Sequence, residues 1–527
     1  MTIRHPVRLL LAGLGLGWAF DLLFWGKTPG ISILIYAILL LAGLALTLRW
    51  QRVQPMPVNL WMAVLVLVFA AWAFIRANAF LIFLNVAAVL ALLVLISANL
   101  VRNATLGLRV RDLLLAPLEA MVYSLSGAVF LLGESRRAIR RDLGEKPTRN
   151  LPAVMIGLLI SLPLLLVLIP LLMSADMVFA DMMRSIFVLD AIIERSVRLL
   201  FMGLLGLVVG GAWVYTAQTR TPAPAIAETP SSSAAKAPQS HRLGPIEVLI
   251  PLILTNLLFL IFIIIQIAYL FGGVANITEH GYTYAEYARR GFAELVIAAL
   301  IIFGVILVLR SLGRLESPRA RRAFNLAATL LLTLTIILLL SAFKRLALYE
   351  SAYGFTLMRL LPHVFMVWLG ALLLWFIITL WIAPGRLAIG ILTAAFGFIL
   401  TLNLLNPDAF IVRQNVARFR AHGKLADFMN SRSVDVYYFQ TLSEDAVPAL
   451  LEELPNLRGA RPAVEEDLRR RYQRMQEDDA WRAWQSWNLS RWRAYHLLQT
   501  HFEESPTVSE LAPLPIKTFA SPTDAGS

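Results

Sequence analysis

Charged side chains gather in one short segment of an otherwise oily chain. Residues 282–295 read YTYAEYARRGFAEL. On a helix, Glu286, Arg290 and Glu294 follow one another four residues apart, so one arginine can bridge two carboxylates along a single face. Arg289 would then point about 100° away. If that face borders a hydrated cavity, it can hold an anionic group, because a guanidinium group matches carboxylate and phosphate oxygens.

A ligand is not the only explanation of this segment. The same ion pairs can clamp two neighbouring membrane helices together, which contributes roughly 0.5 to 2 kcal/mol without any bound molecule. Charged side chains inside a bilayer are costly unless they are paired or hydrated, so polar residues near the same membrane face belong to the same question. With the clamp as the alternative, we predict one polar cavity formed by Asp21, Asp176, Gln266, Glu286, Arg289, Arg290, Glu294, Lys344, Arg345, Glu350, Arg359 and His363.

The other chemistry-bearing residues do not indicate a cofactor. The chain has no cysteine, which excludes disulfides, thiolate metal sites and cysteine nucleophiles. No two histidines have the spacing of a metal site, although His280 and His363 could in principle join Asp176 around a metal ion. The run GLGLG lacks the strand that precedes a phosphate-binding loop, and Gly13 and Gly17 suit the close packing of two helices. We expect no cofactor and no bound metal.

The elements that must position these residues are membrane helices. Of the 527 residues, 58% are hydrophobic and 15% are charged, against roughly 25% charged in soluble domains. Apolar runs of about 18 or more residues recur, and each can cross a hydrocarbon core of about 30 Å as a helix. The predicted fold is therefore all-α: a polytopic membrane protein with about 11 transmembrane helices and a helical extramembrane C-terminal region.

The predicted spans divide the chain into two membrane halves and a polar region. They lie at about 8–26, 31–49, 59–75, 80–98, 152–173, 199–216, 246–270, 291–310, 323–343, 361–382 and 386–405. The regions are a membrane half at 1–216 with about six spans and an amphipathic cytoplasmic segment at 104–142, a flexible Pro/Ala/Ser linker at 217–243, a second half at 244–405 with about five spans, a polar helical region at 406–504, and a disordered tail at 505–527.

Basic residues indicate how the chain is threaded. The net charge of +13 could suggest nucleic-acid binding, but Lys and Arg concentrate in short connections between apolar runs, as topology signals do. If the N-terminus is cytoplasmic, the Arg-rich connections around Arg49, Arg137, Arg321 and Arg386 lie inside. The C-terminal region and the predicted cavity then face the outside of an inner membrane. The expected partners are membrane lipids and an anionic small molecule or lipid headgroup, not nucleic acid. The oligomeric state stays open.

Two motifs mark the C-terminal region. Thr441 and Glu444 have capping-box spacing before an apolar run, which predicts a helix start. Trp481, Trp484 and Trp487 follow at a spacing of three. That pattern also fits a sugar-stacking surface or an aromatic belt at a membrane interface, but we favour a helical hairpin that packs these rings inward.

Several long stretches together resemble known bacterial membrane families. They are FDLLFWGKTPGIS at 20–32, SADMVFADMM at 174–183, QIAYLFGGV at 266–274, SAFKRLALYESAYGFTLMRL at 341–360 and LSEDAVPALL at 442–451, together with the charged segment at 282–295. In this order they are similar to the multi-pass families catalogued as domains of unknown function 4153 and 4173. The resemblance implies a prokaryotic inner-membrane protein, and it implies no activity and no catalytic residue.

Three functions fit these observations. The leading interpretation is a transporter or permease-like protein whose outer-facing polar cavity holds an anionic solute or a lipid headgroup. An alternative is a membrane-embedded enzyme acting on an envelope lipid or glycan, with Asp21, Asp176 or Glu286 as the base. The other is a non-catalytic scaffold or sensor, in which the charges only brace helices. We favour transport over catalysis.

Overall fold

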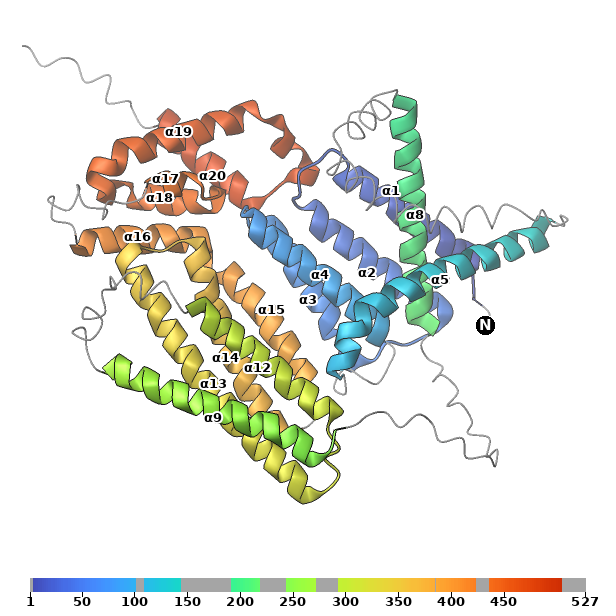
Figure 1. Ribbon diagram of the computed structural model, residues 1–527. Coiled ribbons are helices and arrows are strands. Elements are labelled where there is room, and N and C mark those ends of the chain that lie inside the picture. The colour runs from blue at the N-terminus through green and yellow to red at the C-terminus, as the bar shows by residue number, and fades with distance from the viewer. Residues whose placement is uncertain are drawn as a thin grey trace, which may run out of the picture.

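The protein is built from helices. The structure is a computed structural model that describes residues 3–100, 109–143, 191–218, 243–271, 292–383, 385–422 and 436–504. In these ranges every regular element is helical, and Leu243 and Gly313 form an isolated β-bridge (Figure 1). Eleven of the described helices are long and apolar enough to cross a membrane. The predicted fold class, a polytopic all-α membrane protein, is confirmed.

One of the eleven described spans was not predicted, and one predicted span is not among them. The predicted span at 152–173 lies outside the described residues, as do the linker core at 219–242 and the tail at 505–527. In its place, the stretch Val110–Ile139 meets the length and composition of a span. It belongs to a helix of 34 residues, Val110–Leu143, and covers most of the segment that we predicted to lie on the membrane surface. Its placement relative to the bilayer stays a prediction.

Glycines hold the first membrane half together. A Cβ atom on Gly17 would lie 1.9 Å from the carbonyl oxygen of Met202, and one on Gly13 would lie 2.5 Å from that of Gly206. Only glycine permits helices to approach this closely. The interpretation of GLGLG as a helix-packing motif therefore holds. The helices of this half are α1 Pro6–Phe24, α2 Ser32–Gln51, η1 Pro57–Asn59, α3 Trp61–Ile75, α4 Ala79–Asn99, α5 Val110–Leu143 and α8 Ala191–Gln218.

The second membrane half is centred on one long helix. This helix, α13, packs against α9, α12 and α14 around buried apolar residues such as Phe324, Leu331 and Phe376. The last helix, α15, also joins the other half, because Phe396 and Ile399 share a core with Phe69 of α3. The helices are α9 Pro245–Phe271, α12 Phe292–Leu312, α13 Pro318–Tyr353, α14 Leu357–Trp381 and α15 Leu387–Leu405.

The C-terminal region forms a small helical domain with its own core of residues such as Phe439, Leu450 and Leu468. Figure 1 shows it lying across one end of the membrane helices. Its elements are α16 Pro407–His422, α17 Val436–Gln440, η4 Glu444–Ala446, α18 Val447–Glu453, η5 Leu454–Ala460, α19 Arg461–Glu477, η6 Asp479–Arg482, η7 Trp484–Ser486, α20 Leu489–Gln499 and the π-helical turn η8 Thr500–Glu504.

The first motif does begin a helical segment, at Glu444, but its capping residue differs from the predicted one, and the second motif does not form the predicted helix. Ser443, rather than Thr441, caps the segment, because its hydroxyl accepts a hydrogen bond from the backbone N–H of Asp445. The tryptophan run forms two short 3₁₀ turns instead of a helix. Trp481 packs inward on Tyr495, but Trp484 is exposed. The helix breaks here because the backbone turns to meet the membrane half, where the carbonyl of Trp487 accepts a hydrogen bond from Ile31.

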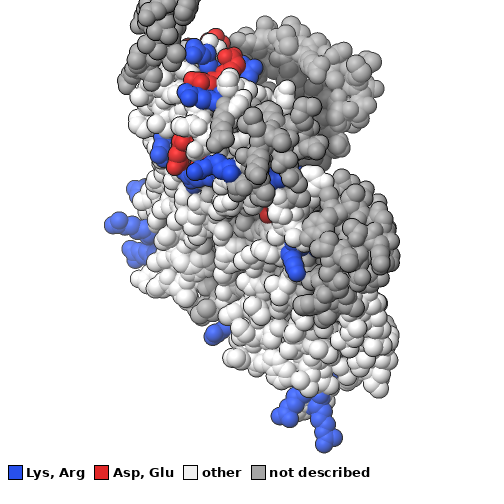
Figure 2. All heavy atoms as spheres, turned by 90° about the vertical axis from the view of Figure 1, so that its left-hand side faces the viewer, with Lys and Arg blue, Asp and Glu red and all other residues white. Residues whose placement is uncertain are grey.

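Among the described residues, four connections touch the C-terminal region, and they lie at one end of the bundle, which we call the capped end. They are the α1–α2, α3–α4, α13–α14 and α15–α16 connections, marked by Ile31, Ala77, Leu357 and Asn406. Antiparallel neighbours must place alternate connections together, and these are the connections predicted to share the outer face. Figure 2 shows charges of both signs over the C-terminal region, basic residues at the opposite tip where α13 begins, and a mostly uncharged surface between them.

Candidate functional site

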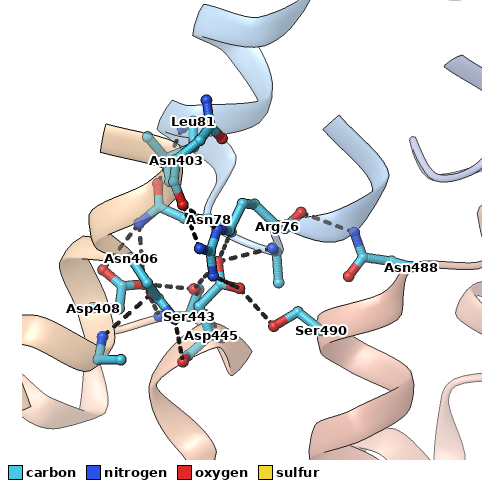
Figure 3. A network of polar contacts seen from close by, with 12 residues as sticks. Arg76, Asn78, Leu81, Asn403, Asn406, Asp408, Ser443, Asp445, Asn488 and Ser490 are labelled. Atoms are coloured by element: carbon cyan, nitrogen blue, oxygen red, sulfur yellow. Dashed lines mark hydrogen bonds and ion pairs between the residues drawn. The ribbon is translucent and has the colours of Figure 1, made fainter. Parts of the chain in front are cut away.

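Buried polar residues from three parts of the chain meet at the capped end. They come from the α3–α4 connection, the α15–α16 connection and the C-terminal region, as Figure 3 shows. The α3–α4 connection is far in sequence from the other two parts. We call this cluster the polar junction: Arg76, Asn78, Asn403, Asn406, Asp408, Ser443, Asp445, Asn488 and Ser490.

Asp445 ties the C-terminal region to the first membrane half. One of its carboxylate oxygens accepts hydrogen bonds from the backbone N–H groups of Ala77 and Asn78, each at 2.9 Å. The other accepts the hydroxyl of Ser490 at 2.5 Å and lies 3.9 Å from the Arg76 guanidinium. The side chain of Asp445 is fully buried. Three hydrogen-bond donors and the charge of Arg76 therefore replace the water that this carboxylate loses.

Asp408, in the first turn of α16, is the second aspartate that ties this connection to the C-terminal region. Both of its oxygens accept hydrogen bonds from the side-chain amide of Asn78, at 3.1 Å. One of them also accepts the backbone N–H and the hydroxyl of Ser443, at 3.0 and 2.5 Å. The amide oxygen of Asn78 in turn caps α4 by accepting the N–H groups of Phe80 and Leu81. The start of α4 is thus held by both aspartates.

One junction residue, Asn403, pairs with Asn85 and so joins the two membrane halves directly. The amides of Asn85 on α4 and Asn403 on α15 exchange two hydrogen bonds, at 2.9 and 2.8 Å, and both are fully buried. The backbone carbonyl of Asn403 accepts a hydrogen bond from Nε of Arg76 at 2.9 Å. Arg76 also lies 5.2 Å above the ring of Trp72. A continuous polar contact therefore runs from the C-terminal region into the membrane core.

The junction holds two carboxyl groups against one guanidinium group. Burial raises the pKa of the Asp445 carboxyl, while hydrogen bonds from Ser490 and Asn78 and the charge of Arg76 oppose that rise. Burial also lowers the pKa of the Arg76 guanidinium, against the attraction of both aspartates. Every carboxylate oxygen has a donor, so the junction is suited to holding helices together rather than to proton transfer. No group of three metal-ligating side chains occurs in the described ranges.

Some predicted site residues come together at the α13–α14 connection. Nδ1 of His363 lies 2.9 Å from a carboxylate oxygen of Glu350, and both side chains are largely buried. Arg359 lies 4.5 Å above the ring of Tyr349 and donates a hydrogen bond to the carbonyl of Gly354 at 2.7 Å. These contacts satisfy the charges within the α13–α14 pair and need no ligand.

The other predicted site residues are dispersed or lie outside the described ranges. Asp21 of α1 is buried in a bidentate ion pair with Arg198 of α8. Lys344 and Glu294 are exposed and Arg345 is half-buried. Gln266 belongs to α9, and its side chain is not described. The single polar cavity therefore stays a prediction, because Asp176, Glu286, Arg289 and Arg290 lie outside the described residues.

A hollow of a different character lies between the two membrane halves. It has a volume of about 370 Å³ and no polar side chain in its lining. Phe80 of α4 forms one wall, and three helices of the second half form the others. We call it the apolar groove: Phe80, Ala293, Val296, Ile297, Leu361, Pro362, Phe365 and Phe398.

Neither feature was predicted from the sequence. The predicted site residues are polar residues near membrane faces, and an apolar groove gives no signal of that kind. The junction residues Arg76 and Asn78 stand in a connection of three residues between two spans, where an arginine reads as a topology signal. Ser443 lies inside the motif interpreted as a capping box, and Asp445 follows it directly. Two polar residues directly between adjoining spans were the usable clue.

The fold and the site together define the class of protein. The described residues contain eleven helices that are long and apolar enough to cross a membrane, with a buried polar junction and a helical C-terminal domain at one end, and this makes the chain a multi-pass integral membrane protein. The chain belongs to the family described as domain of unknown function (DUF4153), whose model matches residues 63–453. The match includes both junction aspartates and the whole lining of the apolar groove.

The family match confirms one of the two resemblances. That to the domain of unknown function 4173 is not confirmed. Among curated proteins and among solved structures, no protein matches the chain.

Proposed function

We propose that the protein is a permease-like membrane protein whose two halves separate at the capped end to admit a substrate, and that the polar junction holds this end closed. The supporting observation is that the contact between the halves near this end includes a buried polar pair. Asn85 of α4 and Asn403 of α15 bond to each other there and are both fully buried. Polar residues at a permanently closed interface cost free energy that apolar residues would not. At an interface that opens to water, they are solvated in the open state and paired in the closed state.

A scaffold is the competing function, and one observation favours it. Every carboxylate oxygen of the junction has a donor in this conformation, which also suits a rigid support. The two functions differ in what happens when the junction is weakened. A permease-like protein opens locally at the capped end, whereas a scaffold loosens as a whole or stays closed.

Thiol labelling separates these outcomes, because the chain has no native cysteine. Leu81→Cys places a thiol in the first turn of α4, at a fully buried position beneath the junction. Ala328→Cys, fully buried in the core of the second half, is the matched control. Each is combined with Asp445→Ala in proteoliposomes and labelled with a water-soluble maleimide.

The proposal predicts that Asp445→Ala speeds labelling at residue 81 by about tenfold or more and leaves residue 328 unchanged. Equal acceleration at both positions would mean general loosening. No acceleration at either would mean that the junction does not control opening. Both results contradict the proposal.

A further inference from the structure

The apolar groove lies at the depth of one membrane leaflet. Phe80 is the second residue of α4, and Leu361 and Pro362 stand in the second turn of α14, so both walls begin at the capped end. Phe398 lies seven residues before the end of α15, which is roughly 10 Å along a helix that rises 1.5 Å per residue. The hydrocarbon core is about 30 Å thick. The groove therefore spans much of the leaflet next to the capped end and does not cross the membrane.

The groove opens sideways between membrane helices. Ile297 is 55% exposed and Phe80 is 38% exposed, although both line the groove. In a soluble protein such a hollow would fill with water at a free-energy cost. Between helices that span a bilayer, the molecules that meet this opening are lipids, and their acyl chains match a lining without polar atoms.

Polar residues follow two of the lining residues in the chain, and we call the part of the groove beside them its polar end. Glu294 follows the lining residue Ala293 and is exposed, and His363 with its partner Glu350 follows Pro362 directly in the chain. These residues lie toward the capped end, where the headgroups of that leaflet begin. An apolar groove with polar residues near one end is complementary to an amphiphile lying parallel to the helices.

We infer that the apolar groove binds an acyl chain of a membrane phospholipid, which makes phospholipid the substrate class of the permease-like protein. That phospholipid is a substrate rests on the proposed function. That an acyl chain binds rests on the groove alone. The groove is shared between the halves, so separation of the halves would open one of its walls and release the chain.

The test uses the full-length protein in nanodiscs made of phosphatidylethanolamine and phosphatidylglycerol. After transfer to detergent, native mass spectrometry counts the phospholipids that stay bound, and their mass identifies the headgroup. Ile297→Trp fills the groove. Ile301→Trp is the matched control, because residue 301 lies one turn further along α12, is 58% exposed and does not line the groove.

We expect wild type and Ile301→Trp to retain one phospholipid per chain, and Ile297→Trp to retain about tenfold less or none. Ala293→Phe, which narrows the groove at its polar end, should show the same loss and replaces Ile297→Trp if that variant does not fold. Equal retention in Ile297→Trp and Ile301→Trp, or no retained lipid in wild type, overturns the inference.

The inference and the proposed function fail separately. Retained phospholipid without accelerated labelling at residue 81 would uphold the groove as a lipid site and overturn the permease-like function. Accelerated labelling without retained phospholipid would do the reverse.

Discussion

The carboxylate of Asp445 accepts the backbone N–H of Asn78 at 2.9 Å across a separation of 367 residues. The C-terminal domain thus bonds to the chain between two membrane helices rather than to a side chain on their surface. Because backbone donors cannot rotate away, this contact fixes the start of α4 to the C-terminal domain.

Asp445→Ala should lower stability strongly. The substitution leaves two backbone N–H groups, the Ser490 hydroxyl and Arg76 without their buried acceptor, at a cost of about 3 kcal/mol or more. The apparent melting temperature in detergent measures this. Glu452→Ala is the control, because its pair with Arg413 is exposed and contributes little. Similar melting temperatures for the two variants would contradict the role assigned to Asp445.

The contribution of Asp445 should depend on pH. Burial raises its pKa in the folded protein above the unfolded value of about 3.9. In the window above that value the folded state binds more protons than the unfolded chain, so stability falls as pH rises through the folded pKa. The melting temperature of wild type should therefore decline more steeply from about pH 4 upward than that of Asp445→Ala. Parallel pH profiles would count against this coupling.

Asn85 and Asn403 should behave as a coupled pair. Asn403→Leu leaves the buried amide of Asn85 without its partner and should cost about 1 to 3 kcal/mol. The double variant Asn85→Leu with Asn403→Leu should recover part of this loss, since replacing both partners by apolar groups can be nearly neutral. A double-mutant cycle of unfolding free energies measures the coupling. Strict additivity of the two single variants would rule the coupling out.

Gly17→Ala should separate α1 from α8. The added Cβ would lie 1.9 Å from the carbonyl oxygen of Met202, and the resulting shift should cost about 1 to 3 kcal/mol. Gly15→Ala is the matched control on the same helix, because nothing lies within 4 Å of its Cβ. Alanine favours helix over glycine, so the control should be neutral or slightly stabilised in thermal melts. Destabilisation of both variants alike would argue against the close contact.

The capped end should face the outside of the cell. Arg470 of the C-terminal domain and Arg321 at the opposite tip are both exposed. Each is replaced by cysteine in a separate variant. An impermeant maleimide should label residue 470 in intact cells and residue 321 only after lysis. Labelling of residue 321 alone in intact cells would invert the predicted topology.

The sequence by itself determined the class of fold and the approximate position of most spans. Hydropathy is a local property, because a run of about 18 apolar residues is long enough to cross a membrane whatever it contacts. Close helix packing at Gly13 and Gly17 was also readable, since few other uses suit glycines four apart in an apolar run.

Only the tertiary structure decided which residues meet. Asn78 and Asp408 are 330 residues apart, and no local pattern specifies such a pair. The tryptophan run illustrates the same limit, because contacts with the α1–α2 connection override its helical spacing. The groove depends on four helices from both halves, and its apolar residues look in sequence like any others facing lipid. Local composition sets where a segment can lie, whereas partners are chosen by packing and hydrogen bonding over the whole chain.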